Sequence, residues 1–256
     1  MTTINTPTYW DDELKSRLKW LTDEQKDKLF EMLKEDKKLR ENKNEWNSEK
    51  LINSELKYFD TIIHEIETMK ENVDKIHNLH ESNIFKTTFE FILDGFNFAL
   101  DDFKYYSDKW HSNKNIKSSD IRTDIQDILK KECTARKGCI NQIMIFLSYS
   151  RNSIIKNQMN EHWIDVSLLE NICSNITKML NEINMEVIVP TVLMDNFDQN
   201  LHDYENGSVW IDRYFPNIDA RDYKKWTIFD IISIGYEIKD EKGNIIESKK
   251  PTLKFY

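Results

Sequence analysis

Glycine and proline are scarce in this chain, and their scarcity limits what the chain can fold into. Among 256 residues there are 5 Gly and 4 Pro. Tight turns depend heavily on these two residue types, so a β-sandwich or β-barrel is disfavoured. A phosphate-binding loop built on closely spaced glycines is disfavoured for the same reason. We therefore expect long helices joined by few tight turns.

The charge balance and the apolar pattern narrow the class of protein. Asp and Glu number 45 against 36 Lys and Arg, giving a net charge of −9, and no stretch is strongly basic. A nucleic-acid surface needs clustered Lys and Arg, so we expect no nucleic-acid partner. No apolar run approaches the ~20 residues that cross a bilayer, and residues 1–5 lack the features of a signal peptide. We expect a cytoplasmic protein with no membrane partner.

Residue patterns that support catalysis or metal binding are few. His64, His77 and His80 lie on one expected helix, and the spacing of the last two could place two imidazoles on one helix face. However, no second helix carries a Glu-x-x-His pair, and no nucleophile elbow, Walker loop or dinucleotide fingerprint is present. Cys133, Cys139 and Cys173 match no Cys-x-x-Cys spacing, so we expect reduced, buried thiols. We expect no catalytic residue, no metal and no cofactor, and so no enzyme.

Helical periodicity organises the N-terminal part of the chain. Apolar residues recur at helical spacing within 10–21, a capping box at 22–25 predicts a new helix start, and 47–49 predicts another. From residue 49 a heptad pattern follows. Its expected seam residues are Ile52, Leu56, Phe59, Ile63, Ile66 and Val73. This helix either pairs with a second copy of the chain in a dimer or docks on the chain's own core.

Residues 83–110 are apolar on nearly every helical face, which predicts a buried helix at the centre of a bundle. Within it, Asp94-Gly95 predicts a kink or a close helix contact. Further helical patterns cover 120–158 and run from 165 or 167 to 184.

Strand patterns are confined to the C-terminal part of the chain. Residues 185–189 and 231–238 are rich in β-branched and other apolar residues, which predicts strands. Residues 244–246 continue the pattern after a loop at 240–243, in which Gly243 suits a left-handed position. Residues 253–256 form a last strand. The expected fold is α+β: mostly α-helical with long paired helices and a helical bundle, followed by a small C-terminal β domain. The expected divisions are a helical extension at 1–48, the bundle at 49–184 with an insertion at 101–163, and the β domain at 185–256.

Four motifs in order resemble the GrpE family, the nucleotide exchange factors of DnaK-type heat-shock chaperones. Residues 185–188 read Met-Glu-Val-Ile, and 197–202 read Phe-Asp-Gln-Asn-Leu-His. The family has Gly-Val-Glu-Val-Ile and Phe-Asp-Pro-Asn-Leu-His at this junction between bundle and β wing. The Gly-Tyr pair of the wing corresponds to Gly235-Tyr236, ahead of the closing hairpin. Residues 91–100 resemble a bundle helix of the family. The resemblance covers about 49–110 and 165–256.

The resemblance implies a co-chaperone for protein folding and stress response that catalyses no bond chemistry. Such a protein binds the ATPase domain of a DnaK-type chaperone as a homodimer, and its β wing opens the nucleotide cleft so that ADP leaves faster. The residues implied in partner binding or at the domain junction are Phe197, Asp198, Asn200, Leu201, His202, Gly235, Tyr236 and Gly243. For Asp198, Asn200 and His202 we favour a role in capping the turn over direct contact with a partner.

Several departures from the family pattern leave a second hypothesis open. Gln199 replaces a Pro, Asn184 replaces a Gly, and the connection at 101–163 is far longer than in the family. A helical adaptor or scaffold that has the GrpE-like shape, lacks exchange activity and binds another partner fits these departures. A helical metalloenzyme that uses the three histidines is a third hypothesis.

Overall fold

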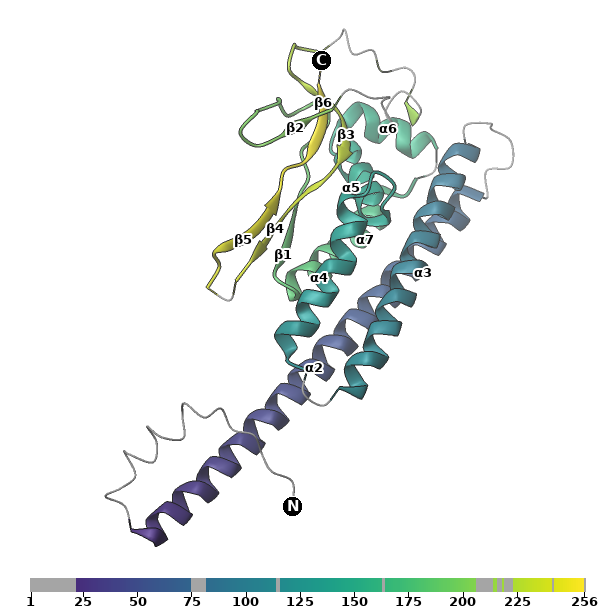
Figure 1. Cartoon of the computed structure of the whole chain (residues 1–256). Coiled ribbons are helices and arrows are strands. Elements are labelled where there is room, and N and C mark those ends of the chain that lie inside the picture. The colour runs from purple at the N-terminus through teal and green to yellow at the C-terminus, as the bar shows by residue number, and fades with distance from the viewer. Residues whose placement is uncertain are drawn as a thin grey trace. The chain divides into compact units, whose positions relative to one another are not determined.

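The computed structural model describes residues 22–74, 82–113, 116–162, 164–205, 214–215, 218, 223–240 and 242–255. The helices are α2 (Asp23–Asp74), α3 (Ser82–Ser112), α4 (Ser118–Thr134), α5 (Cys139–Ser150), α6 (Ser153–Glu161) and α7 (Val166–Glu182). The strands are β1 (Met185–Ile188), β2 (Asp203–Tyr204), β3 (Ile228–Ser233), β4 (Gly235–Lys239), β5 (Ile245–Lys249) and β6 (Thr252–Phe255). Helices precede strands along the chain (Figure 1), which confirms the predicted α+β class with mostly helical content.

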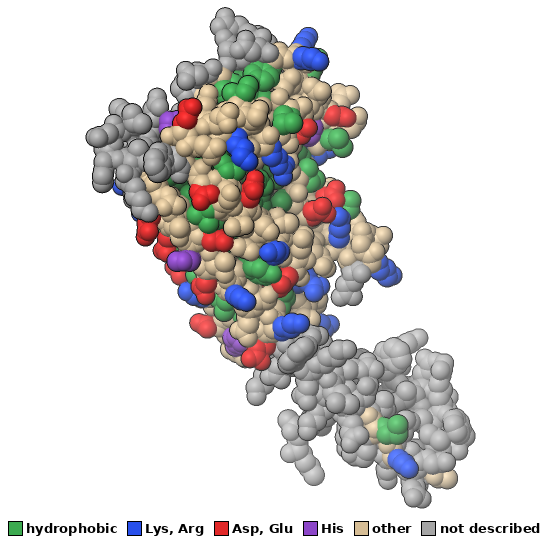
Figure 2. All heavy atoms as spheres, turned by 180° about the vertical axis from the view of Figure 1, so that it is seen from behind, with side chains coloured by type: hydrophobic (Ala, Val, Ile, Leu, Met, Phe, Trp, Pro, Cys, Tyr) green, Lys and Arg blue, Asp and Glu red, His purple; other side chains and the backbone are tan. Residues whose placement is uncertain are grey.

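The chain divides into two compact units, Met1–Asn47 and Ser48–Tyr256. Helices α3 to α7 and all of the described strands belong to the second unit, together with the part of α2 from Ser48 onward. Within the described part of the chain, no helix is both long enough and apolar enough to span a membrane. On the face shown in Figure 2, Lys and Arg side chains are interspersed with Asp and Glu.

Helix α2 is one continuous helix of 52 residues. It begins directly after Thr22, where the capping box predicts a helix start. The further start predicted at 47–49 is wrong, because the helix passes through these residues. Lys and Glu, which are good helix formers, surround this position, and no Gly or Pro is present to end the helix. The apolar pattern at 10–21 lies outside the described residues.

Seven positions of α2 form a buried seam at alternating steps of three and four residues. They are Ile52, Glu55, Phe59, Ile62, Ile66, Met69 and Val73, each at most 2% exposed. The prediction is wrong at two positions, because Leu56 and Ile63 are half-buried beside the seam. Glu55 and Ile62 take their places. The heptad pattern counts only apolar residues, so it assigns Leu56 to the seam in place of the preceding residue, Glu55.

Helices of the same chain cover this seam. Helix α3 runs beside α2 in the opposite direction (Figure 1), with the rings of Phe59 and Phe103 centred 5.7 Å apart. On another side, the Asn175 amide of α7 donates a hydrogen bond to the Glu65 carboxylate of α2 at 3.0 Å. The seam therefore packs in the chain's own core, which was one of the two predicted alternatives. Pairing with a second copy through the seam would require this core to open.

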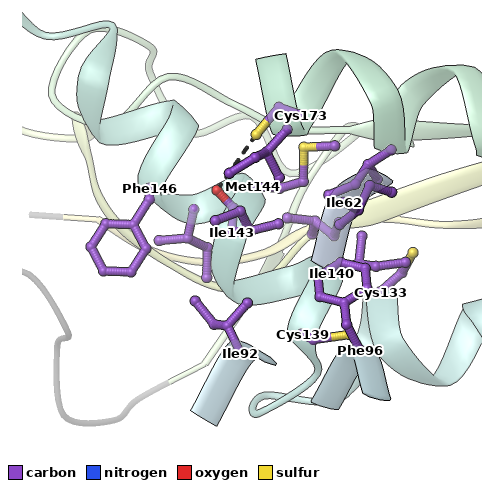
Figure 3. Close-up of a cluster of buried hydrophobic side chains, with 14 of the residues drawn as sticks. Ile62, Ile92, Phe96, Cys133, Cys139, Ile140, Ile143, Met144, Phe146 and Cys173 are labelled. Atoms are coloured by element: carbon purple, nitrogen blue, oxygen red, sulfur yellow. Dashed lines mark hydrogen bonds between the residues drawn. The ribbon is translucent and has the colours of Figure 1, made fainter. Parts of the chain in front are cut away.

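Helix α5 lies at the centre of the bundle. All of its residues except Leu147 are buried. Figure 3 shows the cluster around it: Ile62 from α2, Ile92 and Phe96 from α3, Cys133 from α4, Cys139, Ile140, Ile143, Met144 and Phe146 from α5, and Cys173 from α7. The prediction that 83–110 form the fully buried helix is wrong, because α3 keeps Phe98 and Tyr105 exposed. The predicted close helix contact at Gly95 is confirmed: a Cβ there would lie 2.8 Å from Cβ of Cys139.

The strands form two three-stranded sheets, ordered β1-β4-β5 and β2-β6-β3. All pairs are antiparallel except β2 with β6. The apolar run predicted as a single strand at 231–238 breaks at Ile234, where the chain leaves the second sheet as β3 and enters the first as β4. The β4–β5 hairpin is present as predicted, with Gly243 at φ +84°. We refer to the described residues of 185–255 as the β region.

Candidate partner-binding surface of the β region

Local hydrogen bonds hold the turn at 197–202, which carries most of the predicted site residues. The Asp198 carboxylate accepts a hydrogen bond from the backbone N–H of Asn200 at 2.8 Å, as in an Asx turn. The backbone N–H of Asp198 donates to Nδ1 of His202 at 3.0 Å, and the backbone N–H of His202 donates to the Asp198 carbonyl at 2.8 Å. The structure thus gives Asp198 and His202 the turn-holding role that we favoured. The Asn200 side chain is exposed instead.

The environment of His202 keeps its imidazole neutral. Partial burial lowers the pKa of His202, and the nearby carboxylates of Asp198 and Asp195 oppose this effect only in part. A neutral ring has one nitrogen free to accept a hydrogen bond, and Nδ1 accepts from the Asp198 N–H. Protonation of that nitrogen would remove the acceptor, so the neutral imidazole belongs to the turn as it is folded.

A cluster of four aromatic rings lies beside the turn. The Phe255 ring is at its centre, 4.2 Å from the Phe197 ring, 4.7 Å from Tyr204 and 4.9 Å from Trp226, measured between centroids. Tyr204 and Trp226 are nearly half exposed. The Phe255 ring belongs to β6 and the Phe197 ring belongs to the turn. The cluster therefore joins the turn to the sheet β2-β6-β3.

An open hollow of about 560 Å³ lies against this cluster, lined by residues 196–202 and Trp226. Leu201, at its edge, is 62% exposed. Trp226 has φ +74°, a left-handed conformation that is costly for an aromatic residue. The Trp226 carbonyl accepts from the Phe197 N–H at 2.8 Å, which ties this strained residue to the turn. Exposed apolar groups beside carboxylate and amide side chains suit contact with another protein.

The remaining predicted site residues belong to the other sheet. Gly235 leaves no room for a side chain, since a Cβ there would lie 2.6 Å from the Lys249 carbonyl oxygen. Tyr236 is buried, and its hydroxyl donates to Glu247 at 2.6 Å, while Glu247 also pairs with Lys130 of α4 at 2.7 Å. Gly235 and Tyr236 therefore fix the hairpin to the bundle. The structure does not bring them into the hollow beside the turn.

The hairpin itself is exposed beyond this anchor. Gly243 lies in its loop with no atom near the position of a Cβ. Ile245 and Ile246 follow in β5, 55% and 65% exposed. Strand β5 is at the edge of its sheet, and no other strand of the described residues pairs with its outer backbone groups. The β region thus offers two exposed apolar surfaces, one at the turn and one at the hairpin.

Sequence reasoning missed the side chains of α5 that hold the β region. The Asn141 amide donates to the Ile232 carbonyl at 3.1 Å, and its oxygen accepts from the Ile234 N–H at 2.8 Å. The Ser148 hydroxyl donates to the Pro190 carbonyl at 2.6 Å. The available signal was the presence of these polar residues in an otherwise apolar helix. Each of these side chains forms hydrogen bonds with strand or loop backbone of the β region.

Sequence reasoning also missed Trp226, which lies ahead of β3 outside every motif quoted above. A tryptophan next to two lysines at the edge of a strand was the available signal, and the ammonium of Lys225 lies 5.3 Å from its ring centroid. The ammonium group of Lys225 is attracted to the face of the Trp226 ring, and this attraction helps to stabilise the ring in its exposed position.

The histidines of the third hypothesis do not form a site in the described residues. His64 is exposed on α2, whereas 75–81, including the other two histidines, lie outside the described residues. Across the described part of the chain, no three His, Cys, Asp or Glu side chains are placed to hold a metal ion. The three cysteines are free and buried, as predicted. Burial raises the pKa of each thiol, so none is a reactive thiolate at neutral pH.

Comparison with known proteins returned no family whose model matches the chain, no similar curated protein and no similar solved structure.

Proposed function

We propose that this protein is a GrpE-like nucleotide exchange factor that binds the ATPase domain of a DnaK-type chaperone in the cytoplasm. The observation that carries the proposal is the grouping of the motifs. Met185–Ile188 pairs in the sheet with the strand that begins at Gly235–Tyr236, and the turn at 197–202 lies in the segment between them. In the fold they belong to one β region, directly connected to the helical bundle through β1. This is the order of bundle and wing that the resemblance implies.

The proposed mechanism is selective binding of one conformation of the chaperone. A protein that binds the open nucleotide cleft more tightly than the closed cleft shifts the population toward the open form, and ADP leaves faster. The exposed side chains of Leu201 and Ile246 supply apolar contact for such binding. The two hydrogen bonds between the Asn141 side chain and the backbone of Ile232 and Ile234 keep the β region fixed to the bundle, so binding energy is not lost in ordering it.

Stopped-flow release of fluorescent ADP from the DnaK-type chaperones of the same organism tests the proposal. The full chain should accelerate release, and Leu201→Ser or Ile246→Ser should reduce the acceleration at least tenfold. Ile154→Ser is the matched control, because Ile154 on α6 is 53% exposed and distant in sequence from the β region. Release that is no faster with the full chain, for every chaperone tested, would contradict the proposal.

The adaptor hypothesis is the second candidate, and the seam of α2 favours it. Four of the six side chains predicted for a dimer seam, Ile52, Phe59, Ile66 and Val73, are buried in the chain's own core, and the other two pack against it half-buried. An adaptor needs no dimer, whereas exchange factors of the family bind as dimers. Pull-down from the native host with mass spectrometry separates the two hypotheses: a chaperone among the recovered proteins supports exchange, and its absence beside other specific partners supports the adaptor.

A further inference from the structure

Helix α3 contains a sevenfold repeat that the proposed function does not use. Residues 91–97 read Phe-Ile-Leu-Asp-Gly-Phe-Asn, 98–104 read Phe-Ala-Leu-Asp-Asp-Phe-Lys, and 105–111 read Tyr-Tyr-Ser-Asp-Lys-Trp-His. Each repeat has an aromatic residue first, Asp fourth and an aromatic residue sixth. Seven residues are nearly two turns of helix, so equal positions of the three repeats form rows along the helix.

The two aromatic rows have different surroundings. The sixth-position residues Phe96, Phe103 and Trp110 are at most 3% exposed and form part of the core. The first-position residues are exposed: Phe91 by 42%, Phe98 by 65% and Tyr105 by 71%. Core packing explains the first row only. The second row leaves about 350 Å² of aromatic surface uncovered, if each side chain presents roughly 200 Å², and a patch of this size on a monomer is often functional.

An acidic row runs beside the exposed aromatic row. Asp94, Asp101 and Asp108 are exposed, and each follows an exposed aromatic residue by three positions, so the two are adjacent on the helix surface. None of the three forms an ion pair within the described part of the chain. The face spans about 21 Å from Phe91 to Tyr105, the rise of two heptads, so three residues of a partner helix at heptad spacing can lie against the three rings.

The acidic row argues against a second copy of the chain as the occupant. Two identical α3 helices that pair in parallel set their acidic rows against each other, and two that pair antiparallel set each acidic row against the partner's aromatic rings, whose faces carry partial negative charge. Like charges at close range disfavour either pairing. A helix with Lys or Arg at heptad spacing beside apolar residues satisfies both rows at once.

We propose that this face of α3 is the docking site for a basic amphipathic helix of a partner protein. The partner's apolar residues, seven apart, pack on Phe91, Phe98 and Tyr105 in the helix-against-helix mode. Its Lys or Arg residues lie against the three aspartates. This site is on α3 and does not depend on exchange activity of the β region.

Synthetic peptides test the proposal by fluorescence anisotropy with the full-length protein. The probe is a fluorescein-labelled helical peptide of three heptads with Leu at two positions and Lys at two flanking positions of each heptad. The matched peptide has Glu in place of every Lys. We expect the Lys peptide to bind at least tenfold more tightly than the Glu peptide. Phe98→Ser should weaken binding of the Lys peptide at least tenfold, and Ile154→Ser should leave it unchanged.

A charge-reversed variant separates docking from general attraction of a cationic peptide to an acidic protein. Replacing Asp94, Asp101 and Asp108 with Lys should transfer the preference to the Glu peptide. Equal binding of the Lys peptide to the wild type and to Phe98→Ser would overturn the proposal, and so would absence of binding. A dimer in light scattering that dissociates in Phe98→Ser would overturn it in favour of a second copy. Since Phe98 is exposed, circular dichroism should show an unchanged fold.

Discussion

Glu55 provides a sharp test of how α2 is packed. Its side chain is fully buried at a seam position, and neither carboxylate oxygen has a hydrogen-bond partner among the described residues. Burial, followed by the nearby charge of Glu182, raises the pKa of Glu55 from 4.5 to about 9. The folded protein therefore holds this carboxyl in its neutral form at pH 7, whereas the unfolded chain ionises it.

The free energy of unfolding must then depend on pH in a definite direction. A raised pKa in the folded state gives stability that is fully present below about pH 4.5 and is lost as pH rises toward 9. Each pH unit in this window costs about 1.4 kcal/mol, so at pH 7 the loss is about 3 kcal/mol. That is a large part of the ~5–15 kcal/mol that stabilises a typical domain.

Glu55→Gln removes the ionisation and keeps the size of the side chain. We expect the variant to match the wild type near pH 4, and to exceed its free energy of unfolding by about 3 kcal/mol at pH 7. Urea unfolding followed by circular dichroism at each pH unit from 4 to 9 measures the difference. Glu67→Gln, at an exposed position of α2, is the control and should follow the wild type. A difference between Glu55→Gln and the wild type that does not grow with pH would refute the reasoning.

Three further predictions concern the bundle. Asn141→Leu should lower the free energy of unfolding by about 2–4 kcal/mol in urea titrations, because two buried backbone groups of the β3–β4 crossover lose their partner; Asn97→Leu, at an exposed position of α3, should have little effect. Gly95→Ala should destabilise the protein by about 1–3 kcal/mol in thermal melts, because the added methyl collides with Cys139, and a gain in stability would contradict that close approach. The cysteines should react with a thiol reagent only at the rate of unfolding, and fast labelling of the native protein would contradict their burial.

The sequence allowed the fold class to be predicted because helical and strand periodicities lie in separate parts of the chain. It did not allow the burial of each face to be predicted. Residues 83–110 have aromatic side chains on two faces of a helix, and composition alone does not show that only one face is covered. Helix α5 carries Asn141 and Ser148, polar residues that a periodicity argument assigns to solvent, although backbone groups distant in sequence satisfy them.

The candidate surface was predictable only in part for a similar reason. The turn at 197–202 has strong local signals, since Asp198 and His202 bond to backbone groups within four residues. Trp226 and Phe255 reach the same surface from other parts of the chain, and no local pattern links them to the turn. Glu55 is a charged residue at a buried position of α2. Its place in the seam can be recognised only when the packing of the helix is known.

The crossover at Ile234 has a consequence for dividing this protein into fragments. β3 and β4 belong to different sheets, and the single residue between them is held by a side chain of α5. A cut between α7 and β1 would separate Asn141 from its two backbone partners in the β region, the Ile232 carbonyl and the Ile234 N–H. The isolated strands would lose the partner of both backbone groups, and the isolated helices would keep only the hydrogen bond from the Asn141 amide to the Arg136 carbonyl. The bundle and the β region should therefore be expressed, crystallised and assayed together.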